Sequence, residues 1–236
     1  MGIVELGGII IAQATQRVEL AAQNMANMTT VGYKSHRQFQ SLVDSGQSGF
    51  AIAHGSSRTD DMSVDFTAGK LQHTGNPFDL AISGTGFFVV RTDDGLLYTR
   101  AGQFDRDAEG RLISPDGGVL QSTAGDVRVE SGDVSILADG TFLQNGQPIG
   151  QLAIADFDDP RVLRPVGAGL FSAPSGAARD VAGPQVHQGM LEASNVTTAN
   201  EMISMMAGLR SAEAGQRVVQ VYDDLMGRAL MAFGQM

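Results

Sequence analysis

Apolar residues recur at helical spacing only near the two ends of this chain. Over residues 3–28 they return mostly at steps of three and four, which predicts a helix that ends near residues 29–32. From about residue 196 to residue 233 the steps alternate in a heptad pattern, which predicts a second helix with a continuous apolar seam. All seven prolines lie between Pro77 and Pro184, so neither predicted helix contains one.

The middle of the chain follows a different pattern, in which short β-forming runs alternate with turn dipeptides. Asp139-Gly140 and Asn145-Gly146 are two such dipeptides, and they supply the positive φ angles that tight hairpins need. Regular short strands of this kind predict an antiparallel sandwich or barrel-like module. We therefore expect an α+β fold, with N- and C-terminal helices paired as a coiled coil and a central antiparallel all-β module.

These patterns also predict the domain organisation. The N-terminal helix and the C-terminal helix would form an inner coiled-coil domain, and an extended connector would lead from the first helix to the β-rich domain. The expected boundaries are residues 1–34 for the N-terminal helix, 35–70 for the connector, 71–188 for the central β-rich domain and 189–236 for the C-terminal helix.

The C-terminal helix is predicted to be longer than the β module is wide. At 1.5 Å per residue, a helix over residues 196–233 is about 57 Å long, and Thr198 with Glu201 offers a capping box at its start. Its seam therefore needs another helix, either the N-terminal one or a helix of a neighbouring subunit, and a self-contained hairpin in one monomer is the alternative. The expected seam residues are Leu6, Ile10, Met25, Met205, Leu209, Ala212, Val219, Tyr222, Met226, Ala229 and Phe233.

Composition and charge exclude several classes of protein. The net charge of −10 argues against nucleic-acid binding, because the 16 basic residues are scattered and form no basic face. The absence of cysteine excludes disulfides and thiolate metal sites. The early apolar run Ile9–Ala12 is far shorter than the roughly 18 residues of a membrane span. No basic segment precedes it, so we expect neither a membrane span nor a conventional cleaved signal peptide.

The chain offers little that predicts catalysis or ligand binding. Its four histidines are scattered, and the glycine-rich segment 83–86 precedes a predicted strand rather than the helix that a phosphate loop requires. The segment 105–116 resembles a calcium loop, but Arg106 and Arg111 interrupt it and its flanks read as strands. We expect a hairpin turn there, no metal or cofactor, and no enzyme. A calcium-binding β module with a coiled-coil dimerisation stalk is the rival hypothesis.

Three parts of the chain resemble the signatures of the flagellar rod and hook protein family. They are residues 22–34 (AQNMANMTTVGYK), residues 74–88 continued by 98–104, and residues 189–196 continued by Glu201 and Met202. They occur in the family's order and span nearly the whole chain. The matching residues are Asn24, Asn27, Gly32, Tyr33, Gly75, Asn76, Pro77, Asp79, Gly84, Gly86, Phe87, Gly189, Glu192, Ser194, Asn195, Glu201 and Met202.

The resemblance implies a structural subunit of the axial rod of the bacterial flagellar basal body. The length and the brief segment 158–188 resemble proximal-rod members, with distal-rod members next and the longer hook protein less similar. In this family the terminal helices pair into an inner coiled-coil layer, and the β module lies outside it. The implied partners are other rod subunits, copies of the chain itself and the flagellar type III export apparatus, and the implied location is the rod in the periplasm.

Several signature residues also have physical interpretations of their own. Asn24 can hydrogen-bond across helices, and Asn27 either does the same or only helps to end the helix. We expect Gly32 to permit the turn out of the helix, and Gly75-Asn76-Pro77 to form a fixed bend. Phe87 and Phe88 alternate between the two faces of a strand, so we expect one in the core and the other available to a neighbour.

Overall fold

The computed structural model describes residues 3–38, 62–130, 132–181 and 183–233. The chain divides into two compact units. The helical unit comprises Met1–Ala26, His36–Ser63 and Val196–Met236, and the β-rich unit comprises Asn27–Ser35 and Val64–Asn195. Of the expected connector over residues 35–70, the segment 39–61 lies outside the described residues.

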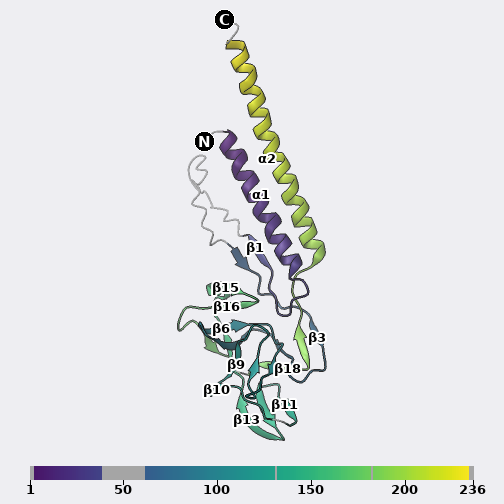
Figure 1. Ribbon diagram of the computed structural model, residues 1–236, viewed down its shortest axis with the longest axis vertical. Coiled ribbons are helices and arrows are strands. Elements are labelled where there is room, and N and C mark those ends of the chain that lie inside the picture. The colour runs from purple at the N-terminus through teal and green to yellow at the C-terminus, as the bar shows by residue number, and fades with distance from the viewer. Residues whose placement is uncertain (1–2, 39–61, 131, 182, 234–236) are drawn as a thin grey trace. The chain divides into compact units, whose positions relative to one another are not determined.

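The helical unit consists of two long helices and a short two-stranded sheet (Figure 1). Helix α1 spans Ile3–Ala26 and helix α2 spans Thr198–Phe233, while strand β1 (His36–Gln38) pairs with strand β2 (Met62–Val64). Small or apolar residues are buried on α1 at intervals of seven, at Gly7, Ala14 and Ala21. Such spacing keeps one stripe of a helix facing one neighbour.

Helix α2 begins one residue away from the expected capping arrangement. The Thr197 carbonyl accepts hydrogen bonds from the amides of Asn200 at 3.0 Å and Glu201 at 3.2 Å, so Thr197 occupies the N-cap position. The carboxylate of Glu201 accepts a hydrogen bond from Asn24 on α1. The capping box expected at Thr198 is therefore corrected, because Thr198 is the first helical residue and not the N-cap.

Within the described residues, neither helix combines the length and the apolar character that crossing a membrane requires.

The β-rich unit is built mainly of antiparallel strands. The largest sheet has ten strands in the order β15-β16-β6-β5-β9-β8-β7, with β10, β14 and β17 joined beside this path. A three-stranded sheet has the order β11-β12-β13, and β18 pairs with β4 and β19 with β3. The bounds are β3 Leu71–His73, β4 Leu80–Ser83, β5 Phe87–Thr92, β6 Gly95–Thr99, β7 Asp105–Arg106, β8 Leu112–Ile113, β9 Val119–Ser122, β10 Gly125–Asp126, β11 Val134–Ile136, β12 Thr141–Gln144, β13 Gln147–Gln151, β14 Ile154–Asp156, the 3-10 helix η1 Pro160–Val162, β15 Arg164–Gly167, β16 Leu170–Ser172, β17 Arg179–Asp180, β18 Gln185–Gln188 and β19 Met190–Glu192.

The two turn dipeptides mark hairpins as predicted. Gly140, with a φ of 81°, precedes β12, and Asn145 (50°) with Gly146 (77°) joins β12 to β13. These are left-handed conformations that Gly and Asn adopt at little cost. The expected α+β class with a central antiparallel β module is thus confirmed.

The β-rich unit contains two separate apolar clusters, one on each side of strand β5. Phe88 lies in the first cluster together with Phe104, Leu120 and Phe142. Phe87 lies in the second, where its ring packs edge-on against the ring of Phe157. Phe87 and Phe88 are only 3% and 0% exposed. The expectation that one of them faces a neighbour was therefore wrong, because both faces of the strand are covered from within the chain.

Two small sheets in the β-rich unit each pair an early strand with a late strand that lies more than 100 residues further along the chain. Strand β18 pairs with β4, with His187 opposite Ala81, and β19 pairs with β3, with Leu191 opposite Gln72. As a result, residues 189–195, which we assigned to the C-terminal helix domain, lie in the β-rich unit. The helix itself starts only at Thr198.

Candidate functional site: the helix pair and a buried charge cluster

The two helices pack side by side in antiparallel orientation (Figure 1). A Cβ atom built on Gly7 of α1 would lie 2.6 Å from Cγ2 of Val219 on α2. Further along, a Cβ on Gly208 of α2 would lie 2.7 Å from Cγ2 of Val18 on α1. Early residues of α1 thus meet late residues of α2, and the reverse holds at the other end of the pair.

Glycine brings the two helix backbones close together. A Cβ on Gly215 would lie 2.8 Å from Cγ1 of Ile11 and 3.2 Å from the carbonyl oxygen of Gly7. Real Cβ atoms essentially never lie within 3.0 Å of another atom, so larger side chains at these positions would force the helices apart. Gly208 and Gly215 thus permit a close approach of α2 to α1.

Asn24 connects three elements of the helical unit at the end of this helix pair. Its Oδ1 accepts the backbone N–H of His36 at 2.9 Å, and its Nδ2 donates to the His36 carbonyl at 2.9 Å. The same Nδ2 lies 3.3 Å from Oε2 of Glu201 on α2. The side chain is buried, and a buried amide needs such partners. Asn24 therefore fixes β1 and the start of α2 to the end of α1.

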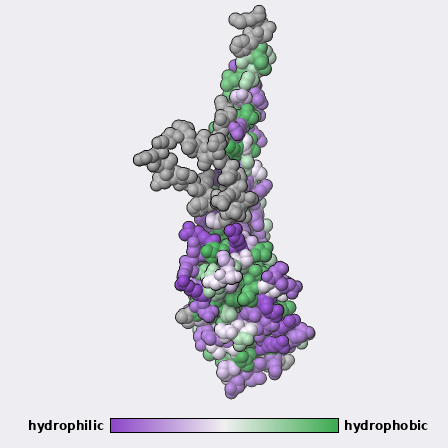
Figure 2. Space-filling view, turned by 90° about the vertical axis from the view of Figure 1, so that its left-hand side faces the viewer, coloured by the Kyte–Doolittle hydropathy of each residue, from purple (hydrophilic) through white to green (hydrophobic). Residues whose placement is uncertain are grey.

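The C-terminal part of α2 runs past the start of α1 (Figure 1). Because Val219 already lies opposite Gly7, no residue of α1 that the structure describes lies opposite the last turns of α2. Large apolar side chains are exposed there, including Leu230 at 66% and Met231 at 73%. Figure 2 shows hydrophobic side chains along this part of the helix. We call residues 223–233 of α2 the overhang.

The expected seam residues fall into two groups. Ile10 and Val219 contact the facing helix, and Met25, Met205, Ala212 and Tyr222 are partly buried. In contrast, Leu6, Leu209, Met226 and Ala229 are exposed. The side chain of Phe233 lies outside the described residues. Met226 and Ala229 lie on the overhang, whereas Leu6 and Leu209 lie in the paired stretch and are 40% and 51% exposed, so these two expected seam residues are not covered by the facing helix.

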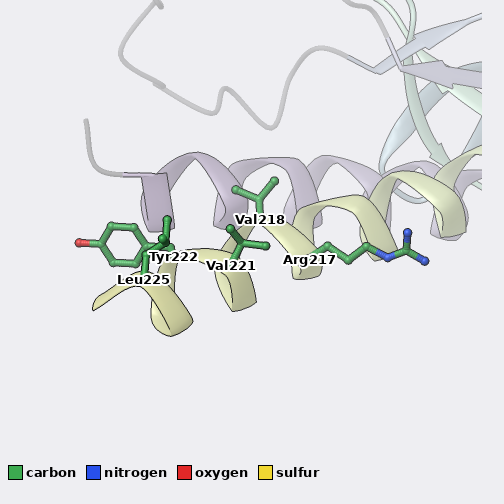
Figure 3. Close-up of a pocket in the computed structure, with 5 residues that line it drawn as sticks. All are labelled: Arg217, Val218, Val221, Tyr222 and Leu225. Atoms are coloured by element: carbon green, nitrogen blue, oxygen red, sulfur yellow. The ribbon is translucent and has the colours of Figure 1, made fainter. Parts of the chain in front are cut away.

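An apolar cavity of about 270 Å³ lies beside the overhang on α2. Figure 3 shows its five lining residues on successive turns of the helix. Val221 and Leu225 among them are more than half exposed. Because the lining includes the seam residue Tyr222 as well as Val221 and Leu225, the exposed apolar surface of α2 is wider than the seam alone. The lining residues are Arg217, Val218, Val221, Tyr222 and Leu225.

A buried charge cluster lies in the β-rich unit, and sequence reasoning did not find it. Nζ of Lys34 lies 2.6 Å from Oε1 of Glu192, and Nη1 of Arg100 lies 3.3 Å from Oε2 of the same carboxylate. Lys34 and Glu192 are each 1% exposed and Arg100 is 5% exposed. Backbone carbonyls satisfy further donors, since Lys34 donates to Thr67 at 2.8 Å and Arg100 to Gly84 at 2.6 Å.

Burial dominates the electrostatics of this cluster. Removal from water lowers the pKa of Lys34, and the attraction and hydrogen bond of Glu192 oppose that change. The same two influences act on Arg100, where burial again outweighs Glu192 and lowers the pKa of the guanidinium. Two cations share one carboxylate, so removal of Glu192 would leave both of them buried without the carboxylate to which they are bonded.

Asn195 adds a second set of bonds beside the charge cluster. Its Oδ1 accepts the backbone N–H of Ser35 at 2.8 Å, and its Nδ2 donates to the carbonyls of Asp65 at 2.7 Å and Thr67 at 3.1 Å. The backbone N–H of Asn195 also donates to the carbonyl of Tyr33 at 3.4 Å. The segment that carries Glu192 and Asn195 thus bonds to two earlier segments of the chain.

Glycines let these segments approach closely. Gly32 has a φ of 66°, and a Cβ there would overlap the backbone nitrogen of Ala101. The backbone N–H of Gly32 donates to the carbonyl of Glu192 at 2.7 Å. Gly32 therefore makes the expected turn after α1, and it also permits contact with the segment around Arg100.

The bend at residues 75–79 is a hydrogen-bonded turn. Oδ1 of Asn76 accepts the backbone N–H of Phe78 at 3.2 Å, and Nδ2 of Asn76 donates to Oδ1 of Asp79 at 3.1 Å. The Asp79 carbonyl accepts the N–H of Gly189 at 2.8 Å. Gly75 has a φ of 78°, which favours glycine. This turn joins the second signature to the third.

The signature residues thus meet in three places, although a few lie apart from all of them. The first place is in the helical unit, where Asn24 meets Glu201. The second is the charge cluster of the β-rich unit, which gathers Gly32, Tyr33, Glu192 and Asn195. The third is the turn in the same unit, which is surrounded by Gly75, Asn76, Pro77, Asp79 and Gly189.

The remaining signature residues lie elsewhere. Gly84 and Gly86, with φ of 96° and 111°, form the turn before β5. Asn27 accepts the N–H of Thr30 in the turn after α1, Met202 is half exposed and Ser194 is partly buried.

The segment that resembles a calcium loop is a hairpin turn. The carboxylate of Asp107 accepts hydrogen bonds from the backbone of Glu109 at 3.0 Å and from both the backbone and the side chain of Arg111. Strands β7 and β8 flank the turn. Among the described residues, no three acidic, histidine or cysteine side chains are arranged to hold a metal ion. The calcium hypothesis therefore has no support.

Comparison with known protein families gives two matches. Residues 81–144 match the family described as the flagellar hook protein FlgE/F/G D1 domain, which covers most of the strands from β4 to β12. Residues 187–231 match the family described as the flagellar basal body rod FlgEFG protein C-terminal region, which covers β19 and most of α2. The two matches include the buried Glu192 and the uncovered end of α2.

Curated relatives are similar over almost their whole length. The chain is 29% identical to the flagellar basal-body rod protein FlgF of Caulobacter vibrioides, over 93% of both chains. It is 31% identical to the rod protein FlgG of Agrobacterium fabrum, over 91% of this chain and 92% of the relative. It is also 31% identical to FlgF of Escherichia coli, over 92% of both chains. With the helix pair, the antiparallel β module and these similarities in place, the chain belongs to the family of flagellar basal-body rod proteins.

Proposed function

We propose that this chain is a structural subunit of the bacterial flagellar basal-body rod, with a mechanical and not a catalytic role. The observation that carries the proposal is the overhang of α2. Its apolar side chains, such as Leu230 and Met231, are exposed, whereas both sides of strand β5 in the β-rich unit are covered from within the chain. A large exposed apolar surface on one element is typical of an interaction site.

The helix pair is the assembly module in this proposal. The seven-residue spacing of Gly7, Ala14 and Ala21 on α1, and of Gly208 and Gly215 on α2, supports a short antiparallel coiled coil. The overhang would then complete its seam against helices of neighbouring subunits. In the family that the sequence resembles, the terminal helices form the inner layer of the rod and the β module lies outside.

Assembly of such chains would be helical. A subunit that joins its neighbours through unlike faces generates an open tube rather than a closed ring. The proposed partners are copies of this chain and other proximal- and distal-rod proteins, and delivery would occur through the flagellar type III export apparatus. The rod would cross the periplasm and transmit torque through packed helices.

Within the rod we propose the proximal segment. The length of the chain and its short segment 158–188 support this position, and relatives named FlgF are among the similar proteins. A distal position is the alternative, since relatives named FlgG are equally similar in identity and coverage.

The test replaces two apolar residues of the overhang. We expect the double variant Met226→Asp/Leu230→Asp to abolish rod assembly and motility in cells, because two carboxylates would have to be buried between helices. The β-rich unit should remain folded, because its two apolar clusters contain neither residue. Electron microscopy of basal bodies and swimming assays measure assembly, and limited proteolysis of the purified chain measures folding.

Arg228→Asp is the matched control. It changes the net charge of the overhang by −2, as the double variant does, but at a polar position that is exposed. We expect this control to assemble rods. If the double variant forms normal rods and swims, the overhang is not the assembly surface and the proposal is wrong.

A further inference from the structure

Glu192 bonds to three segments of the β-rich unit that are far apart in sequence. One carboxylate oxygen accepts hydrogen bonds from Nζ of Lys34 at 2.6 Å and from the backbone N–H of Gly69 at 2.7 Å. The other oxygen accepts from Arg100 at 3.3 Å, and the backbone carbonyl accepts from Gly32 at 2.7 Å. Residue 192 follows these partners by 92 to 160 positions, so the bonds can form only after most of the unit is present.

The three segments differ in how easily they can be released. Arg100 directly follows β6, which is held between β16 and β5 within the large sheet. Its guanidinium also donates to the carbonyls of Ile82 and Gly84. Lys34 and Gly69, in contrast, lie in irregular chain outside any strand. Loss of the carboxylate would therefore leave Arg100 in place and free the other two segments.

The bonds of Asn195 act on the same two irregular segments. Its side chain joins Ser35 to Asp65 and Thr67, and a backbone hydrogen bond from the N–H of Asp65 to the carbonyl of Ser35, at 2.9 Å, also joins these segments. Gly69 fits tightly under residue 193, because a Cβ there would overlap the Ala193 carbonyl oxygen. The segment 192–195 thus supplies both the counter-ion and the covering surface.

We propose that the Glu192 carboxylate acts as a latch, by which we mean that residues 32–35 and 65–70 pack stably in the β-rich unit only when it binds them. Their packing, which we call closure, therefore depends on the C-terminal segment 189–195. Without the Glu192 carboxylate, Lys34 would keep its charge only by returning to water, since a buried ammonium without a counter-ion is strongly unfavourable. The strands around β5 and β9 would fold without the latch, and the chain segment next to α1 would close last. This inference concerns the β-rich unit alone and does not depend on rod assembly.

Hydrogen exchange of the full-length chain, followed by mass spectrometry, tests the latch. In Glu192→Gln we expect the amides of residues 32–35 and 65–70 to exchange about 100-fold faster than in the parent chain. Protection of β5 and β9 should be unchanged. Glu109→Gln is the matched control, because it makes the same substitution at an exposed glutamate of the same unit, and it should leave both regions unchanged.

A second variant separates a latch from general damage. In Glu192→Gln/Lys34→Met the buried ammonium that has lost its carboxylate is also removed. This double variant should restore part of the protection of residues 65–70 against hydrogen exchange. If Glu192→Gln does not fold, Glu192→Asp takes its place, since it keeps the charge but shortens the side chain, and it should show the same local opening. The proposal is overturned if residues 32–35 and 65–70 stay protected, if β5 and β9 lose protection to the same extent, or if the double variant exchanges as fast as the single one.

Discussion

The two units of this protein bury apolar surface in different ways. The β-rich unit covers both faces of strand β5, so Phe87 and Phe88 are both buried by side chains of the same unit. In the helical unit the apolar residues buried on α1 are small or few, such as Ala14 and Ala21, and large ones on α2 remain exposed. The apolar residues of β5 are therefore covered within the chain, whereas the described part of α2 keeps large apolar side chains exposed.

This difference separates the apolar surface that stabilises the folded chain from the apolar surface that α2 leaves exposed to possible partners. Burial of a large apolar side chain contributes roughly 1.5–3 kcal/mol, and the β-rich unit obtains this contribution during its own folding. On α2 the side chains of Ile203, Leu225 and Leu230 are each more than half exposed. In the proposed rod their burial would occur on association, and that part of the free energy would then be available for assembly.

The largest effect is expected from breaking the core of the β-rich unit. Phe88→Ala should lower its free energy of unfolding by about 3–5 kcal/mol, because a fully buried ring leaves a cavity. Urea unfolding monitored by circular dichroism measures the change. Leu96→Ala on the neighbouring strand β6 is the control, since Leu96 is exposed, and it should change stability by less than about 0.5 kcal/mol. Loss of the helix signal in step with the strand signal would mean that the units are not separate.

A smaller effect is expected from a change in the helix pair. Gly7→Leu should lower the melting temperature of the helical unit, with a loss of about 1–3 kcal/mol, because the new side chain meets Val219. Gly8→Leu is the neighbouring control. A Cβ at Gly8 would have no atom within 4 Å, and the better helix propensity should stabilise α1 by up to about 1 kcal/mol. Equal melting temperatures in the two variants would contradict the packing of α1 on α2.

The smallest effect concerns an ion pair on the surface of the β-rich unit. A hydrogen bond from Arg91, at 2.7 Å, lowers the pKa of Asp126 below its usual 3.8. A lowered carboxyl pKa stabilises the folded state above pH 3.8, and this contribution is lost as the pH falls through the folded pKa. Asp126→Asn should therefore cost less than about 1 kcal/mol at neutral pH, and the difference should shrink in acid. A difference that grows below pH 3.8, measured by urea unfolding, would contradict the assigned pair.

Local features of the fold were predictable from the sequence, whereas non-local ones were not. The hairpin at Asn145-Gly146 and both helices follow from neighbouring residues, whose turn chemistry and spacing are visible in the chain. The pairing of β18 with β4 was not foreseen, because neither strand indicates a partner about 100 positions away. The burial of Phe87 was missed for the same reason, since part of its cover comes from Phe66 and Phe157, in segments without strong periodicity.

The candidate site shows the same division. The seam on α2 was predictable because it repeats along one helix, although its exposed end could be located only once α1 was seen to pair with it. The charge cluster was missed, because Lys34, Arg100 and Glu192 come from three separate signatures. The few charged residues within those mostly uncharged stretches were the one available signal, and they carry no information on which charges meet.

The unequal lengths of the two helices set a requirement for any partner. Helix α2 has 36 residues and α1 has 24, so the longer helix exceeds the shorter by 12 residues, or about 18 Å at 1.5 Å per residue. A partner that seals this remainder must supply about three turns of helix with a complementary apolar face. In the proposed rod, stacked copies would then have their helix ends at different heights along the axis. Every cross-section of the shaft would therefore pass through continuous helices and not through helix ends alone.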